Sequence, residues 1–136
     1  MKRRFVSLFT LCILLFATAF SFAACGEKKE NVEDVVIRIE EPVAEGTTLL
    51  DVMEDLQTEG KLTFTVSDGM ITEINGVKNT VTYNPCWMLY TSAANNSNTA
   101  WGTYDYEGVT LGSATVGAGE LMVSEGETYV WTYQSF

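Results

Sequence analysis

A short apolar run in the second half of the chain constrains the fold more than any other feature. Residues 86–90, with the sequence CWMLY, come directly after Asn84 and Pro85. Proline has no backbone N–H and pushes its neighbour out of the helical region, so it ends whatever element precedes it. A run of this length is too short for a helix, which needs about ten or more residues. We therefore predict that residues 86–90 form a buried central strand around which the rest of the domain packs.

The N-terminus has the organisation of a bacterial export signal. Residues 1–4 (MKRR) are basic, and residues 5–22 are almost wholly apolar. A basic segment, an apolar segment and small residues before a cleavage point are typical of a secretory signal. Because positive charges stay on the inner side, we expect the residues from 26 onward to lie outside the cell membrane.

The end of this segment resembles a bacterial lipobox, in which small residues precede an invariant cysteine. Here the sequence is Phe22-Ala23-Ala24-Cys25, with Phe22 where the family usually has an aliphatic residue. The resemblance implies a lipid on the Cys25 sulfur and cleavage before it, so residues 1–24 are predicted to be a lipoprotein signal peptide. The alternative is an uncleaved membrane anchor, since the apolar run is about long enough to span a bilayer.

Removal of the signal peptide leaves an acidic protein. Five basic residues then face eighteen acidic ones, which gives a formal net charge of −13. Such a surface repels nucleic acid and anionic lipid headgroups. We therefore predict no nucleic-acid partner, and attachment to the membrane that depends on the lipid at Cys25. Residues 25–34 are predicted to be the lipidated cysteine and a charged, solvated tether that leads to a domain at 35–136.

The cysteine and histidine content argues against catalysis. The chain has no histidine, and Cys86 is left without a partner when Cys12 is cleaved off and Cys25 is lipidated. No basic residue is near Cys86 in sequence, so a small buried apolar role is favoured over a reactive thiol. Motifs for a metal centre, a nucleophile elbow or a phosphate-binding loop are missing from the sequence. We predict a protein that is not an enzyme and uses no cofactor or metal, with glycoside hydrolysis by two carboxylates left open.

One helix follows a first strand in the predicted domain. Residues 35–39 (VVIRI) are β-branched and predict that strand. Residues 46–57 predict the helix, with Thr48 as its N-cap, Asp51 three residues later, and apolar side chains that recur on one face. Gly60 is a natural helix stop.

Short strands separated by turns follow the helix. Residues 61–66 and 70–74 predict two strands, and residues 67–69 (SDG) between them are a hairpin signal. Asn75-Gly76 predicts a second turn. Residues 81–83 predict a short strand immediately before the central one.

The last third of the chain mixes polar loops, aromatic residues and glycine. Residues 91–100 predict a loop, and residues 101–106 (WGTYDY) are aromatic. Residues 108–119 are rich in glycine and are compatible with either a weak strand or a mobile loop. Residues 121–123 and 128–133 predict two strands around an acidic turn. The fold class is therefore predicted to be α+β, with one helix packed on a sheet of six or seven short, mostly antiparallel strands.

Four blocks in order resemble a bacterial surface-domain family that is similar to the C-terminal β-domain of transcobalamin and intrinsic factor. They are GTTLLDVM at 46–53, ITEINGV at 71–77, WMLY at 87–90 and GETYVWTY at 126–133. The resemblance covers about 35–133 and implies an α+β fold close to a β-grasp. In the vertebrate carriers this domain closes over cobalamin that a helical barrel holds, and the barrel has no counterpart in these residues.

Aromatic residues are the main candidates for a binding site, because flat rings stack on ligands and carry a polar atom. Trp87 and Trp131 lie in strands that look central, so they are predicted to be core residues. The predicted ligand-binding residues are Tyr90, Trp101, Tyr104 and Tyr106. The last three follow a polar loop and precede a glycine-rich segment, and binding residues concentrate on loops. The resemblance implies that the loop at 91–100 and its flanks face the ligand.

Two functions are compatible with these features. The first is a non-enzymatic lipoprotein, anchored by lipid to the outer face of the bacterial cell membrane, that binds a small ligand. The resemblance makes cobalamin or another corrinoid the candidate ligand. The second is a cell-surface interaction module that docks a partner protein of the envelope or a cell-wall polymer. The four blocks favour the first function, and the small size and missing barrel favour the second.

Overall fold

The computed structural model describes residues 31–136, of which Val32–Phe136 form a compact unit. The predictions of a signal peptide, of lipid on Cys25 and of most of the tether concern residues 1–30 and lie outside the described residues. In the part of the chain that is described, no helix is long and apolar enough to cross a membrane.

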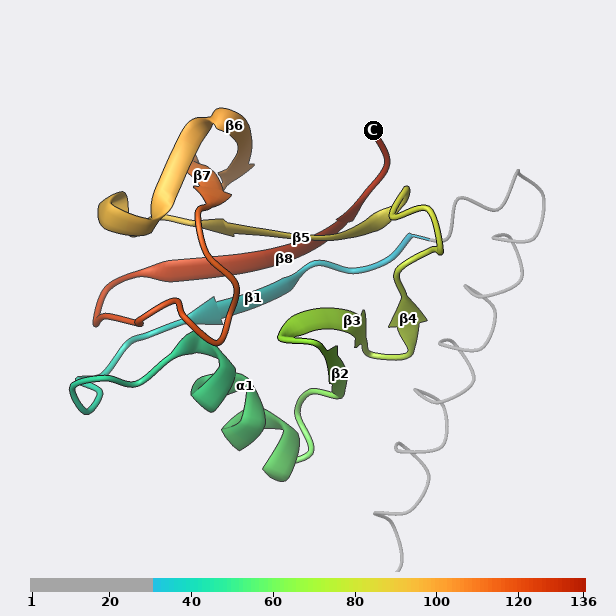
Figure 1. The fold of residues 1–136 in the computed structure, drawn as a ribbon. Coiled ribbons are helices and arrows are strands. Elements are labelled where there is room, and N and C mark those ends of the chain that lie inside the picture. The colour runs from blue at the N-terminus through green and yellow to red at the C-terminus, as the bar shows by residue number, and fades with distance from the viewer. Residues whose placement is uncertain (1–30) are drawn as a thin grey trace, which may run out of the picture. The chain divides into compact units, whose positions relative to one another are not determined.

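Residues 31–136 fold into one helix and two antiparallel sheets (Figure 1). The larger sheet has the strand order β1-β8-β5-β7-β6, and the smaller has the order β2-β3-β4. The elements are β1 (Val35–Arg38), α1 (Leu49–Thr58), β2 (Phe64–Ser67), β3 (Met70–Ile74), β4 (Val77–Lys78), β5 (Cys86–Thr91), β6 (Ser97–Tyr106), β7 (Val109–Ala114) and β8 (Thr128–Gln134). The α+β class is confirmed, but the described residues form 8 strands where we expected six or seven in one sheet.

Helix α1 begins at the predicted cap. The Thr48 hydroxyl accepts the N–H of Asp51 at 3.2 Å, and the Asp51 carboxylate accepts the N–H of Thr48 at 2.8 Å. This capping box satisfies two N–H groups that the start of a helix leaves free. The hydrogen bond from the Thr48 backbone, helped by its hydroxyl, holds the pKa of Asp51 below its usual value. Gly60, just past the helix end, has a φ of 75°, which favours glycine.

Strand β5 lies in the middle of the larger sheet, as predicted for residues 86–90. On one side β8 pairs with β5 over its whole length, residues 86–91. On the other side β7 pairs only with Tyr90 and Thr91. Over residues 86–89, this second edge of β5 is therefore not paired with any of the described strands.

The larger sheet has two different faces, because successive strand residues point to opposite sides. One face packs against α1 and the smaller sheet in the main core. Its buried residues from the sheet strands are Ile37, Trp87, Leu89, Tyr129 and Trp131. The opposite face carries a smaller buried cluster of Tyr90, Leu111 and Val130. Figure 1 shows α1 and the smaller sheet below the larger sheet, with the β6–β7 hairpin above it.

The β6–β7 hairpin covers the second face of the sheet. Its register is interrupted, so that residues 99–102 of β6 form an excursion with no partner on β7. Beyond the excursion, Tyr104 and Tyr106 pack against the smaller cluster. The hairpin ends in a two-residue turn, Glu107-Gly108, in which both φ angles are positive, at 48° and 81°.

Polar contacts tie this hairpin to the N-terminal strand. The Arg38 guanidinium donates to the Tyr106 hydroxyl at 2.7 Å, pairs with Glu107 at 2.5 Å, and lies 5.1 Å from the centre of the Tyr106 ring. The Tyr104 hydroxyl donates to the Asp34 carboxylate. That hydrogen bond, together with burial, raises the pKa of Tyr104 to about 12. The tip of the β6–β7 hairpin is thus held against β1, the strand at the opposite edge of the sheet.

The predicted strand at 61–66 is wrong at its start, because β2 begins at Phe64. The N–H of Lys61 donates to the carbonyl of Leu56 at 2.9 Å, which closes the last turn of the helix. The N–H of Thr63 donates to the Asn75 side chain at 3.1 Å. Local partners therefore take these N–H groups before strand pairing begins.

The predicted strand at 81–83 is also wrong, because these residues form a turn. The N–H of Tyr83 donates to the carbonyl of Thr80 at 3.0 Å, and Tyr83 has a φ of 55°. The Thr80 hydroxyl accepts the N–H of Asn84 at 2.9 Å. Local hydrogen bonds of this kind compete with sheet pairing, and they leave Val81 98% exposed.

The predicted loop at 91–100 is shorter than expected. Strand β5 continues to Thr91, a 3-10 turn covers Ala94–Asn96, and β6 already begins at Ser97. Trp101, Tyr104 and Tyr106 therefore belong to a strand and not to a loop flank. Residues 91–100 are mostly small and polar, so they show no alternation of apolar and polar residues that would predict a strand.

The glycine-rich segment at 108–119 divides into two parts. Val109–Ala114 form strand β7, and the rest is irregular. A Cβ added at Gly112 would lie 3.0 Å from the Cβ of Ser97, so glycine allows the two strands to approach closely. The strand predicted at 121–123 is reduced to a single bridge between Met122 and Thr48.

Candidate functional site

The four predicted ligand-binding aromatic residues do not share one surface. Tyr90 is buried, and its hydroxyl donates to the Gln134 side chain at 2.9 Å. Its ring centre lies 5.7 Å from that of Tyr104. Tyr104 and Tyr106 are half-buried against the same cluster, whereas Trp101 is 65% exposed. The structure thus brings three of the residues together in packing and leaves Trp101 at the surface.

Trp101 stands in the excursion of β6, which rests on Tyr90. The next residue, Gly102, has a φ of 152°, and a Cβ there would lie 3.4 Å from the Tyr90 hydroxyl. A side chain at this position would be strained by the positive φ and would touch the tyrosine ring. Gly102 therefore lets the excursion sit closely on a buried residue while the tryptophan ring faces solvent.

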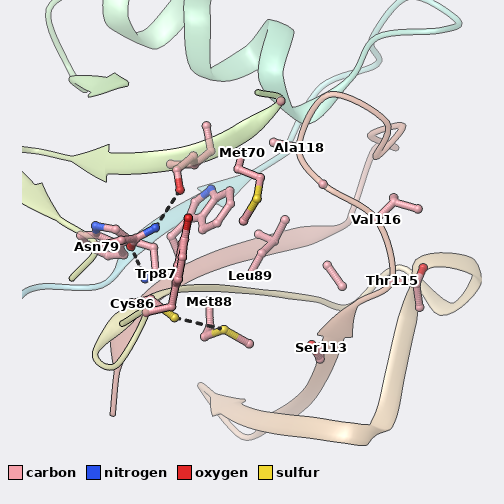
Figure 2. Close-up of a pocket in the computed structure, with 16 residues that line it drawn as sticks. Met70, Asn79, Cys86, Trp87, Met88, Leu89, Ser113, Thr115, Val116 and Ala118 are labelled. Carbon is pink, nitrogen blue, oxygen red and sulfur yellow. Dashed lines mark hydrogen bonds between the residues drawn. The ribbon is translucent and has the colours of Figure 1, made fainter. Parts of the chain in front are cut away.

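A cleft of about 380 Å³ lies beside residues 86–89 of β5, along the edge that β7 leaves unpaired (Figure 2). Its walls come from β5, from the start of β3 and from the irregular segment that follows β7. The residues that line it include Met70, Asn79, Cys86, Trp87, Met88 and Trp131. Figure 2 shows the Met70 side chain between β3 and the segment that carries Val116 and Ala118.

The cleft exists because the chain leaves the sheet after β7. The N–H of Thr115 donates to the carbonyl of Asn96, and the carbonyl of Ala118 accepts the N–H of Leu50 in α1, both at 3.0 Å. These bonds hold residues 115–118 away from the edge of β5, where continued strand pairing would otherwise fill the space. Ser113 and Ala114 are small, so the wall on this side is set back.

Asn79 closes one end of the unpaired edge. Its side-chain oxygen accepts the backbone N–H of Trp87 at 2.8 Å, and its side-chain nitrogen donates to the carbonyl of Ile71 at 3.1 Å. Both bonds are drawn in Figure 2. The indole N–H of Trp87 donates to the carbonyl of Val77 at 2.8 Å. The polar groups of Asn79 and Trp87 are therefore engaged by the protein itself.

The indole of Trp131 is different. This residue also lines the cleft and is 6% exposed. Its Nε1 is the one buried side-chain nitrogen or oxygen in residues 31–136 that has no hydrogen-bond partner. A buried donor without an acceptor is costly and calls for an explanation.

Cys86 lies in the wall of the cleft as a neutral thiol. It is buried, as predicted, and its sulfur lies 3.9 Å from the sulfur of Met88. Burial raises the pKa of Cys86. The thiolate is thereby disfavoured, which suits an apolar wall better than a nucleophile.

The chemistry of the cleft is that of an uncharged, largely apolar surface. None of the residues that line it is acidic or basic. Met70 and Tyr83 line it while remaining 55% and 52% exposed, so they form its solvent side. Within the described residues, no group of His, Cys, Asp or Glu is arranged to hold a metal ion.

Sequence reasoning does not identify this cleft. It favours the core for Trp87 and Trp131 over a binding role, and it makes Met70 part of a strand. The one sequence signal near the cleft is the run of small residues at 112–119, which sets one wall back. Its position beside β5 depends on tertiary structure, which local patterns do not contain.

Comparison with known proteins adds no relative. The chain matches no protein-family model, no curated protein and no solved structure.

Proposed function

We propose that this protein is a non-enzymatic ligand-binding lipoprotein of the bacterial cell envelope, with the cleft beside β5 as its ligand site. The observation that carries the proposal is a cleft of about 380 Å³ whose lining has no charged residue, in a chain with an excess of acidic residues. Small-molecule sites are typically apolar clefts of about 300–1,000 Å³ with a few polar groups. The cleft has this size and this kind of lining.

The proposal includes the predictions made for the N-terminus and for the family. Lipid on Cys25 would keep the domain at the outer face of the membrane, and the acidic surface would hold it away from the headgroups. The resemblance to the transcobalamin β-domain implies a β-grasp-like fold. The packing of a single helix against one face of a five-stranded sheet supports this part of the proposal. The resemblance also supports a corrinoid as the first ligand to test. A whole cobalamin is larger than this cleft, so a corrinoid would extend beyond it and would need a second protein to enclose it.

Binding of a corrinoid is tested by titrating the folded chain with cobalamin and with cobinamide. Calorimetry and tryptophan fluorescence measure the binding. Saturable one-to-one binding that is weakened by Ala118→Leu, which narrows the cleft, would place a corrinoid there. Trp101→Ala is the matched variant outside the cleft, and it tests whether the excursion contributes. If both corrinoids and the compact probes described below fail to bind a chain whose thermal unfolding is cooperative, the proposed function is wrong.

The exposed Trp101 favours a second candidate function, the docking of an envelope protein. Large aromatic side chains at the surface are common anchors of interfaces, and Trp101 is 65% exposed on a closely packed excursion. Envelope extracts passed over the immobilised chain should then yield a protein that Trp101→Ala fails to retain. Equal recovery on both surfaces would remove Trp101 from this role.

A further inference from the structure

We infer that the ligand of the cleft is a compact, uncharged molecule of two or three fused rings with a carbonyl-type oxygen that accepts the indole N–H of Trp131. This inference rests on the proposed function and specifies its ligand class. It departs from the corrinoid, which is larger and does not follow from the cleft itself.

The residues that line the cleft indicate that its ligand is uncharged. The residues around the cleft include no Asp, Glu, Lys or Arg, so a charged ligand would lose its hydration and gain no opposite charge. The chain as a whole has a net negative charge, which further disfavours an anion. A neutral molecule avoids both penalties.

The volume and the lining point to a small ring system. A cavity of about 150 Å³ lined by apolar residues is large enough to bind benzene, and the cleft is about 380 Å³. Trp87, Trp131 and the flexible side chain of Met70 belong to its lining. Aromatic faces and polarisable sulfur make favourable contacts with flat unsaturated rings.

A difference between the two tryptophans of the cleft indicates that the ligand carries a hydrogen-bond acceptor. The indole N–H of Trp87 is bonded to the carbonyl of Val77 at 2.8 Å, whereas that of Trp131 has no partner. A ligand oxygen within reach of Trp131 Nε1 would satisfy the unpartnered donor. A ligand without an oxygen would leave it buried and unsatisfied.

Access to this N–H requires a small movement. Trp131 Nε1 is covered by protein atoms, so part of the wall has to shift before an oxygen reaches it. Met70 is suited to this, because it is unbranched, 55% exposed, and lies at the cleft. Met70→Ile keeps an apolar wall but stiffens it, so it is expected to slow or weaken binding of the oxygen-bearing ligand.

A matched pair of probes tests the inference. 1-Indanone and indane have the same two-ring skeleton and differ in one carbonyl oxygen. The full-length chain, labelled with 15N at tryptophan and reconstituted in phospholipid nanodiscs, has three indole N–H signals to follow by NMR. Each signal is assigned from its Trp→Phe variant, and protein-free nanodiscs correct for partition of the probes into lipid.

We expect 1-indanone to bind more tightly than indane by about two- to twelve-fold, the range of one net hydrogen bond. The Trp131 signal should move downfield with 1-indanone and much less with indane. In Trp131→Phe the preference should disappear. In Trp101→Phe, which removes an indole N–H outside the cleft, the preference should remain.

The outcomes separate this inference from the proposed function. Equal binding of both probes by the wild-type chain, with no downfield shift of the Trp131 signal, overturns the carbonyl acceptor and leaves an apolar ligand site intact. Binding of neither probe overturns the inference, and joined with the failure of both corrinoids it also overturns the proposed function. The comparison of the two probe affinities needs only the wild-type chain, so a misfolded variant does not weaken that part of the test.

Discussion

The two faces of the five-stranded sheet are covered in different ways. On one face, α1, the smaller sheet and the irregular segment after β7 build the main core, which contains most of the buried apolar residues. On the other face a single hairpin encloses a cluster of three buried residues. Polar contacts of Arg38 and Asp34 then hold that hairpin across the sheet.

This difference predicts that the face covered by the helix contributes most of the stability, and that the face covered by the hairpin is the easier one to open. Burial of apolar surface is the largest favourable contribution to folding, and it is concentrated on the face with the helix. Exposed ion pairs and hydrogen bonds contribute little, so we expect the hairpin to open more easily than the main core. Regions with few buried contacts open locally at lower free energy than the core.

Leu49→Ala removes a fully buried side chain of α1 from the main core. We expect the free energy of unfolding to fall by about 4 kcal/mol, since the surrounding elements are held from several sides and cannot collapse into the cavity. Chemical denaturation monitored by circular dichroism measures the change. Val81→Ala, at a 98% exposed position, is the control and should change stability by less than about 0.5 kcal/mol.

Leu111→Ala removes the same side chain from the smaller cluster, where Leu111 is also almost fully buried. We expect a loss of about 3 kcal/mol, at the lower end for such substitutions, because the hairpin can settle into the space. The same denaturation experiment gives the comparison with Leu49→Ala. A loss greater than that of Leu49→Ala would show that the hairpin face is the more rigid one.

Thr48→Ala removes the hydroxyl that caps α1. We expect a loss of about 1 kcal/mol, because the N–H of Asp51 loses its acceptor. Thr48→Ser keeps the hydroxyl and should remain within a few tenths of a kcal/mol of the wild type. Equal losses in both variants would mean that packing of the threonine methyl group, and not the cap, matters at this position.

Tyr104→Phe removes the hydroxyl that donates to Asp34. We expect a loss of about 0.5 kcal/mol at neutral pH, since the contact is partly exposed, and faster hydrogen exchange in the hairpin than in α1. Tyr83→Phe, at a tyrosine outside the hairpin, should leave this exchange unchanged.

The same contact predicts a dependence on alkaline pH. The folded pKa of Tyr104 is raised to about 12, above the ordinary value of about 10, so the folded state keeps its proton longer than the unfolded state. Stability from this group is therefore complete below pH 10 and is lost as the pH rises from about 10 to about 12. Hydrogen exchange at the hairpin should show this loss in the wild type and not in Tyr104→Phe.

The parts of the fold that were predicted correctly are those that local sequence determines. The capping pair of Thr48 and Asp51 identified the helix, and the apolar run after Pro85 identified the central strand. The turns at 67–69 and 75–76 were also predicted, and Asp68, Gly69, Asn75 and Gly76 all have positive φ angles. In each case the signal lies within a few residues of the feature that it specifies.

The parts that were missed depend on contacts distant in sequence. Strand β7 carries no clear alternation, and its glycine is explained only by the approach of Ser97 on β6. The cleft arises where β7 stops pairing with β5, and no pattern within either strand records that point. Of the predicted aromatic residues, Tyr90 proved to be packed because β8 supplies Gln134 for its hydroxyl. The ligand roles of all four remain predictions.

The position of β8 has a consequence for how the chain is made. This strand follows β7 in sequence, yet it lies between β1 and β5 and pairs with both. A chain that is synthesised or exported from its N-terminus therefore presents β1 and β5 before the strand that joins them exists. The joining of β1 to β5 is expected only after residues 128–134 have emerged, and until then the unpaired edges of these two strands need protection from aggregation.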